Sequence, residues 1–76
     1  MLFRSAATAT YDSVIRSAGA TPNEKASAHL WIARMADTRN DRAEALRHYN
    51  AVAALDCAAG LKSEALQGLK KPFGRP

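Results

Sequence analysis

Two histidines and one cysteine carry the most versatile chemistry in this sequence. His29 and His48 could bind a metal ion or transfer protons, and Cys57 could act as a nucleophile. The two histidines are 19 residues apart, and neither has a second His, Cys or acid at the spacing of a metal-binding motif. We therefore expect His29 to be a core or boundary residue, and we predict no metal and no other cofactor.

The remaining polar residues do not form a recognisable catalytic motif. Cys57 is expected near the C-terminal end of a helix, where the helix dipole disfavours a thiolate. The seven carboxylates are scattered, mostly at helix caps or beside bases. The sequence contains no glycine-rich phosphate loop and no nucleophile elbow. We therefore predict a protein that is not an enzyme. Because a lone cysteine forms no internal disulfide, a reducing, cytoplasmic compartment is expected.

The composition favours a small helical fold with a thin core. The chain has 76 residues, of which 17 are alanine. A chain of this length buries only about 60% of the surface that its unfolded form exposes. Alanine is the best helix former and has no large side chain to fill a core. The sequence therefore predicts one all-α domain of marginal stability.

The net charge of +4 is concentrated at one end of the chain. Lys70, Lys71 and Arg75 lie in the last seven residues, which leaves eight bases against seven acids in residues 1–69. A nearly neutral body lacks the basic face that phosphate binding needs, so a nucleic-acid partner is not expected. The alternative is a nucleic-acid-associated helical protein that would use the tail and a small patch of Arg39, Arg42 and Arg47.

Two features of the sequence bear on localisation: the length of its apolar runs and the composition of its first twenty residues. No apolar run approaches the roughly 18 residues of a membrane span, so no membrane partner is expected. The first twenty residues, with Arg4, Arg16 and a single acid, faintly resemble a mitochondrial transit peptide. We prefer an ordinary first helix, because the same residues carry a good buried-face pattern.

Apolar spacing and capping residues predict four helices. Thr21, Pro22 and Glu24 form a capping box with proline in the first turn, which marks a helix start. Gly19 and Gly60 are expected as C-terminal caps, and Gly68 is expected to weaken the last turn and let it fray. The four helices are predicted at residues 3–18, 22–38, 42–58 and 61–70. Residues 1–71 would form a single domain, and residues 72–76 a flexible basic tail.

Residues 26–59 resemble one tetratricopeptide repeat (TPR), a helix-turn-helix unit of about 34 residues. Ala45 and Tyr49 fall on the family's A-x3-F pattern, and Val52 follows at a small position. The first half matches W-x2-L-G-x2-Y loosely, through His29, Ile32, Ala33 and Ala36, and Cys57 stands in place of the terminal proline. Physically, the small residue lets two helices approach, and the aromatic side chain one turn later fills the space beside it. We therefore expect Ala45, Leu46, Tyr49, Val52, Ala53 and the stem of Asp56 to be buried.

The first helix repeats part of this pattern. Ala7, Tyr11 and Val14 reproduce the spacing of Ala45, Tyr49 and Val52 with an offset of 38 residues. The resemblance implies four short antiparallel helices stacked as TPR-like helical hairpins, with about one complete repeat and flanking half-repeats. A different four-helix arrangement, or segments ordered only by a partner, are the alternatives.

The resemblance also implies a function. TPR arrays bind another protein or peptide along the side formed by the first helix of each repeat. Carried over to this sequence, and extended to the large apolar residues of that helix, the partner-binding residues are Ser27, Leu30, Trp31, Arg34, Met35, Asp37 and Thr38. The alternative is that Trp31 and Met35 pack against the fourth helix. Because repeats usually need three or more copies for stability, we also expect a homodimer.

Overall fold

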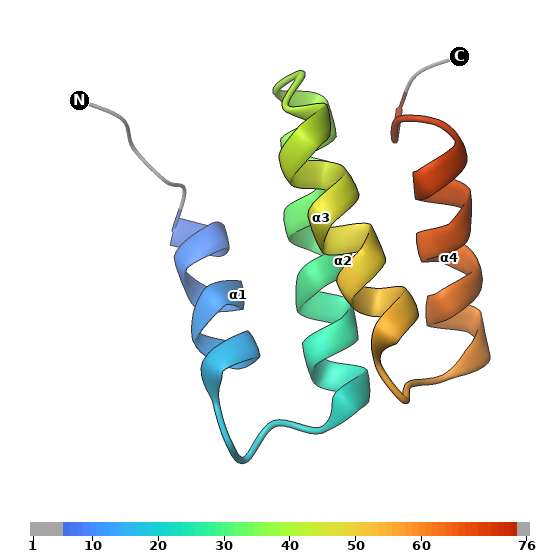
Figure 1. Ribbon diagram of the computed structural model, residues 1–76. Helices are drawn as coiled ribbons and strands as arrows, with labels where there is room; N and C mark the ends of the chain where they lie inside the picture. Colours follow the sequence, from blue (N-terminus) through green and yellow to red (C-terminus); the bar gives the residue numbers. More distant parts are fainter. Residues whose placement is uncertain (1–5, 75–76) are drawn as a thin grey trace.

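The structure is a computed structural model that describes residues 6–74. Within this range the secondary structure consists of four α-helices. They are α1 (Ala6–Arg16), α2 (Pro22–Thr38), α3 (Arg42–Ala54) and α4 (Ala59–Lys70). Successive helices run in opposite directions and are joined by short turns (Figure 1). The prediction of an all-α protein is confirmed. No helix within the described range is long and apolar enough to cross a membrane.

Helix α2 begins as the sequence predicts, because its first amides are capped by side chains. Thr21 Oγ1 accepts a hydrogen bond of 3.1 Å from the Glu24 amide, and Glu24 Oε1 accepts one of 2.8 Å from the Thr21 amide. Pro22 occupies the first turn, where its missing N–H costs no hydrogen bond. The observed bounds of α2 equal the predicted ones.

The boundary between α3 and α4 differs from the prediction. Helix α3 ends at Ala54 rather than residue 58, and Gly60 lies in the first turn of α4 rather than at a C-terminal cap. Leu55 adopts an extended conformation, and Asn23 at the start of α2 accepts a 2.7 Å hydrogen bond from the Ala58 amide. This long-range bond holds the connection in place. Cys57 consequently lies in the connection just before α4, and Asp56 is exposed.

The first helix is also shorter than predicted at its C-terminal end. Helix α1 ends at Arg16, so residues 17 and 18 belong to the turn. Gly19 does not take the left-handed conformation expected of a C-terminal cap. The predicted helical residues 3–5 lie outside the described part of the chain.

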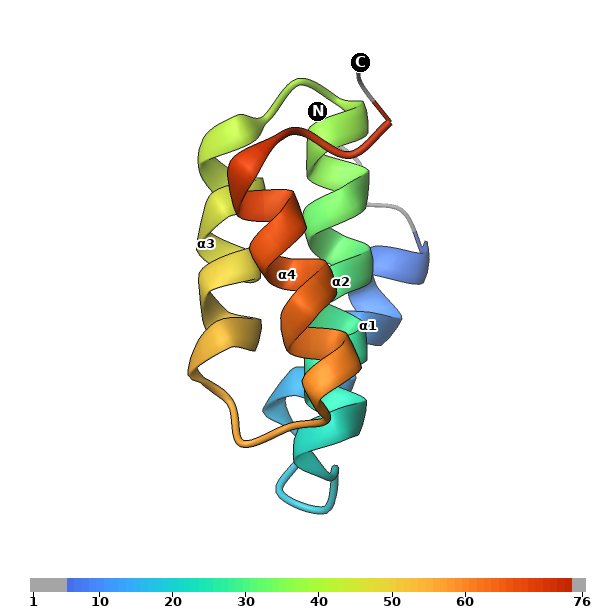
Figure 2. The same cartoon turned by 90° about the vertical axis from the view of Figure 1, so that its right-hand side faces the viewer.

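Three of the four helices pack against one another, and α1 lies at the side of this group. Helix α2 packs against all three other helices, and α3 also packs against α4. Within residues 6–74, α1 contacts α2 but neither α3 nor α4. The molecule is accordingly flat, with extents of 31 × 31 × 15 Å, and α1 lies on the far side of α2 from α4 (Figures 1 and 2).

The core lies among α2, α3 and α4 and is built mostly from alanine. Its buried members are Ala26, Leu30, Ala33, Ala36, Ala45, Tyr49, Val52 and Ala65. Tyr49 is the largest of them and is only 1% exposed. Small alanines let the helix axes approach, and the tyrosine ring fills the space that they leave. The predicted burial of Ala45, Tyr49 and Val52 is confirmed, while Leu46 and Ala53 are partly buried.

Gly68 has a packing role that the sequence pattern does not reveal. It is buried in the last turns of α4, where the ring of Tyr49 lies directly on its backbone. A Cβ atom at this position would be 2.5 Å from Tyr49 Cζ and 2.7 Å from Tyr49 Cδ1. The prediction that Gly68 simply weakens the helix end is therefore incomplete, because the missing side chain lets α3 and α4 meet.

Replacing Gly68 by alanine should destabilise the protein although alanine is the better helix former. The clash with the buried Tyr49 ring should cost about 1–3 kcal/mol, which exceeds the gain in helix propensity of about 1 kcal/mol. Gly60→Ala is the matched control, because a Cβ there would meet nothing within 4 Å. Urea unfolding should show opposite shifts for the two variants. Equal shifts in the same direction would contradict the close approach.

Candidate functional site

The buried carboxylate of Asp37 joins α2 to α3 and to the segment that follows α4. Asp37, in the last turn of α2, is 2% exposed. It accepts a hydrogen bond of 2.9 Å from the Tyr49 hydroxyl and one of 2.9 Å from the Phe73 amide. Arg42, the first residue of α3, donates to both carboxylate oxygens at 3.1 Å. The side chain of Asp37 is thus satisfied from α3 and from the segment that follows α4.

Arg42 extends this network to the end of α4. Its second amino group donates to the carbonyl oxygens of Gly68 and Leu69, at 2.6 and 3.2 Å. The last carbonyl groups of a helix have no partners within the helix, and a cation near them is favourable. One guanidinium group therefore fixes the C-terminal ends of α2 and α4 relative to each other.

The network shifts the pKa values of two buried groups. Burial by itself would raise the pKa of Asp37, but the hydrogen bonds from the Phe73 amide, Tyr49 and Arg42 outweigh it, so the pKa lies below its ordinary value. For Tyr49, burial and the hydrogen bond to the Asp37 carboxylate raise the pKa from 10.0 to about 12. At neutral pH the carboxylate is charged and the phenol is protonated.

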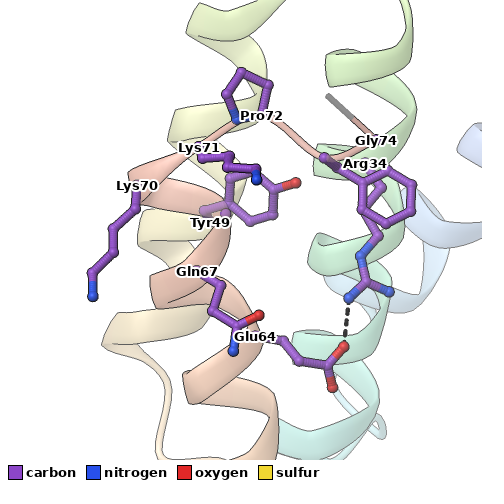
Figure 3. Close-up of a pocket in the computed structure, with 10 residues that line it drawn as sticks. Arg34, Tyr49, Glu64, Gln67, Lys70, Lys71, Pro72 and Gly74 are labelled. Atoms are coloured by element: carbon purple, nitrogen blue, oxygen red, sulfur yellow. Dashed lines mark hydrogen bonds and ion pairs between the residues drawn. The ribbon is translucent and has the colours of Figure 1, made fainter. Parts of the chain in front are cut away.

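An open cleft of about 450 Å³ lies between α2 and α4, next to this network (Figure 3). Its lining includes the buried residues Tyr49 and Gly68. Arg34 and Glu64 lie along one edge (Figure 3). The segment after α4 passes over one end of the cleft (Figure 3). The other lining residues are Gln67, Lys70, Lys71, Pro72, Phe73 and Gly74.

Arg34 is held in the cleft by three neighbouring side chains. It forms an ion pair with Glu64 of α4, and its guanidinium carbon lies 5.6 Å from the Trp31 ring and 5.0 Å from the Phe73 ring. Both distances fall in the range of a cation–π contact. Trp31 and Phe73 remain 48% and 47% exposed, so each aromatic ring presents a large apolar surface beside a held cation.

The residues predicted to bind a partner do not all lie on one accessible surface. Arg34 lines the cleft, Trp31 lies beside it, and Thr38 is exposed with its hydroxyl donating to the Arg34 carbonyl. Ser27 and Met35 are partly buried. Leu30 and Asp37 are 3% and 2% exposed, because they belong to the core and the carboxylate network. A partner that binds this fold cannot reach Leu30 or Asp37.

Sequence reasoning missed the other half of the cleft. No pattern in the sequence predicts that Glu64, Gln67 and the residues after α4 face α2, and Phe73 falls within the predicted tail. The division between residues 71 and 72 stays a prediction, but Phe73 makes two contacts with α2, through its amide and its ring. In the sequence, the signal for these contacts is Phe73, an aromatic residue within a predicted basic tail.

The two histidines form a second group of polar side chains. His29 of α2 and His48 of α3 face each other with their Nδ1 atoms 2.8 Å apart, although 19 residues separate them in the sequence. The ring centroids are 5.0 Å apart and the planes are inclined by 41°. Burial and the neighbouring His48 lower the pKa of His29, while Asp12 of α1 raises it in part. Residue spacing does not reveal this pair, because only the packing of α2 on α3 creates it.

Within residues 6–74, no group of three or more His, Cys, Asp or Glu side chains is placed to hold a metal ion. Comparisons of the chain with protein-family models, with curated proteins and with solved structures found no match. The resemblance of residues 26–59 to a tetratricopeptide repeat therefore stays a prediction.

The raised pKa of Tyr49 predicts a loss of stability in alkali. The unfolded chain ionises this phenol near pH 10, whereas the folded chain retains the proton up to about pH 12. The contribution is complete below pH 10 and is lost as the pH rises toward 12, by roughly 2–3 kcal/mol. Urea unfolding across this range should show that Tyr49→Phe is less stable near neutral pH but less sensitive to alkali. Parallel pH profiles for the two proteins would refute the assignment.

Proposed function

We propose that this chain is a small protein–protein interaction module of the TPR-like type, which binds a peptide or a partner helix and performs no catalysis. The observation that carries the proposal is the cleft between α2 and α4, where a positioned arginine is flanked by two half-exposed aromatic rings. Aromatic residues and arginine are the side chains most enriched at the centres of protein interfaces.

The packing of the helices supports the TPR-like part of the proposal. Helices α2 and α3 form a hairpin, α4 packs on both of them, and α1 packs on α2 alone. An open stack of this kind leaves one side of successive hairpins free for a partner. Ala45 and Tyr49, the two residues that match the family's A-x3-F pattern, are both buried, which supports the proposal that they act as a packing joint.

The size of the cleft fits one or two side chains of a bound segment. A volume of about 450 Å³ lies in the range of small ligand pockets, roughly 300–1,000 Å³. The cations Lys70 and Lys71 stand at its edge, and Glu64 offsets the charge of Arg34. The edge of the cleft is therefore polar and its inner part is aromatic, which is the usual composition of an interface.

The nucleic-acid alternative loses its main support in this arrangement. Arg42 is committed to Asp37 and to the carbonyl groups of α4. Arg39 and Arg47 both pair with Glu44, at 3.2 and 3.4 Å. The three arginines therefore face two carboxylates and retain a net charge of only +1, so we do not propose nucleic acid as the partner. The single free cysteine, Cys57, is consistent with the reducing, cytoplasmic compartment that we propose.

Truncating the two aromatic rings should abolish capture of the partner without loss of helicity. Trp31→Ser and Phe73→Ser each remove a half-exposed ring, and a central interface aromatic contributes about 2 kcal/mol or more. Pull-down of the tagged chain from source lysate, quantified by mass spectrometry, should show the loss. Circular dichroism should show unchanged helix content.

Leu66→Ser is the matched control, because Leu66 is 52% exposed on α4 but does not line the cleft and is not one of the two rings that lie against Arg34. Capture should survive this change. If Leu66→Ser reduces capture as much as the aromatic variants do, or if no variant reduces it, the cleft is not the binding site.

We also propose that the chain forms a homodimer across α2 or α4, which would extend the short stack. Stacked repeats stabilise one another through their neighbours, and α1 has only one neighbour among the described residues. Sedimentation equilibrium at micromolar concentration should give a dimer mass, and the melting temperature should rise with concentration. A monomer that melts cooperatively at every concentration would refute the dimer and leave the peptide-binding proposal intact.

A further inference from the structure

The histidine pair between α2 and α3 has geometry that the interaction module does not use. His29 and His48 belong to neither the cleft nor the carboxylate network, and both are partly buried. Their Nδ1 atoms are 2.8 Å apart, so one ring donates its N–H to the lone pair of the other. The helix hairpin thus holds two imidazole nitrogens at one point, on two different helices.

The choice of metal follows from the type of ligand and not from the separation of the two nitrogens. That separation of 2.8 Å is the length of the N–H···N hydrogen bond, and it changes once the rings turn toward an ion. Imidazole nitrogen is a good ligand for divalent copper, and the affinity of a given nitrogen site is greater for copper than for zinc. A structural zinc site also uses four protein ligands, whereas this pair supplies two.

We propose that His29 and His48 form a two-nitrogen site for a divalent copper ion that links α2 to α3. To bind the ion, each ring must rotate until the lone pair of its Nδ1 atom points at the ion. The ion then lies to one side of the line between the two Nδ1 atoms. The ring that donates its Nδ1 proton must carry that proton on Nε2 instead, and no net proton is gained or lost. Water supplies the remaining ligands, since no third protein ligand completes the group in the described part of the chain.

The electrostatic surroundings suit such an ion. A metal ligand must be a neutral imidazole, and burial together with His48 lowers the pKa of His29. Asp12 of α1 acts on His29 with the opposite sign, and its negative charge also favours a cation at this position. With only two protein ligands, the ion should exchange readily and should tighten the hairpin when bound.

The experiment is titration of the intact chain with copper(II) sulfate in a non-coordinating buffer at neutral pH, followed by electron paramagnetic resonance and thermal unfolding. One ion per chain, nitrogen coupling from two imidazoles and a raised melting temperature are expected. His29→Gln and His48→Gln should each weaken binding at least about tenfold, because the remaining imidazole loses chelation. Zinc should bind more weakly than copper.

Cys57→Ser is the control, because a thiol also binds copper and the Cys57 side chain is only partly buried. Copper binding should survive this change. Circular dichroism without metal identifies any histidine variant that fails to fold. If a variant does not fold, the unaltered chain is measured at acidic pH instead. Protonation of the two imidazoles should then remove the two-nitrogen signal. The proposal is overturned if copper binds equally well without either histidine, if binding disappears in Cys57→Ser, if zinc binds more tightly, or if the unaltered chain binds no copper.

Discussion

The arrangement of α2, α3 and α4 depends on satisfying one buried charge. A carboxylate that is removed from water is stable only when it is paired and hydrogen-bonded. Asp37 meets this requirement with Arg42, Tyr49 and the Phe73 amide, donors that come from α3 and from the segment after α4. Within the described residues, no buried side-chain nitrogen or oxygen lacks a hydrogen-bond partner. Moving any one of these elements would remove at least one donor from the buried carboxylate, so the charge constrains how they meet.

A thin core makes this constraint more important. Alanines bring the helices close but bury little area, and a chain of this size has little hydrophobic stabilisation to spare. Tyr49 links the two kinds of interaction, since its ring lies on Gly68 and its hydroxyl donates to Asp37. Hydrophobic packing alone would allow several similar alanine-rich contacts. We interpret the ion pair of Asp37 and Arg42 as the feature that selects one of them.

Helix α2 is common to both proposed sites. Its C-terminal half carries Trp31 and Arg34 beside the cleft, and His29 faces α3. The helix packs against all three others, so Arg34 can face α4 while His29 faces α3. The central position explains why apolar residues surround α2 on more than one side, which a single-stripe helix would not need. A surface that binds partners and a metal-binding pair can therefore occupy one short helix.

The sequence by itself determined the helices, because caps and apolar spacing act over three or four residues. The capping box of Thr21 and Glu24 and the buried positions of Ala45 and Tyr49 follow from such local rules. Only the tertiary structure decided which side chains meet across helices. The bond from Ala58 to Asn23 after α3, the packing of Tyr49 on Gly68, the pairing of His29 with His48 and the bond from Phe73 to Asp37 join residues 19 to 36 positions apart. Such contacts depend on how the helices pack, and no spacing within a single helix encodes them.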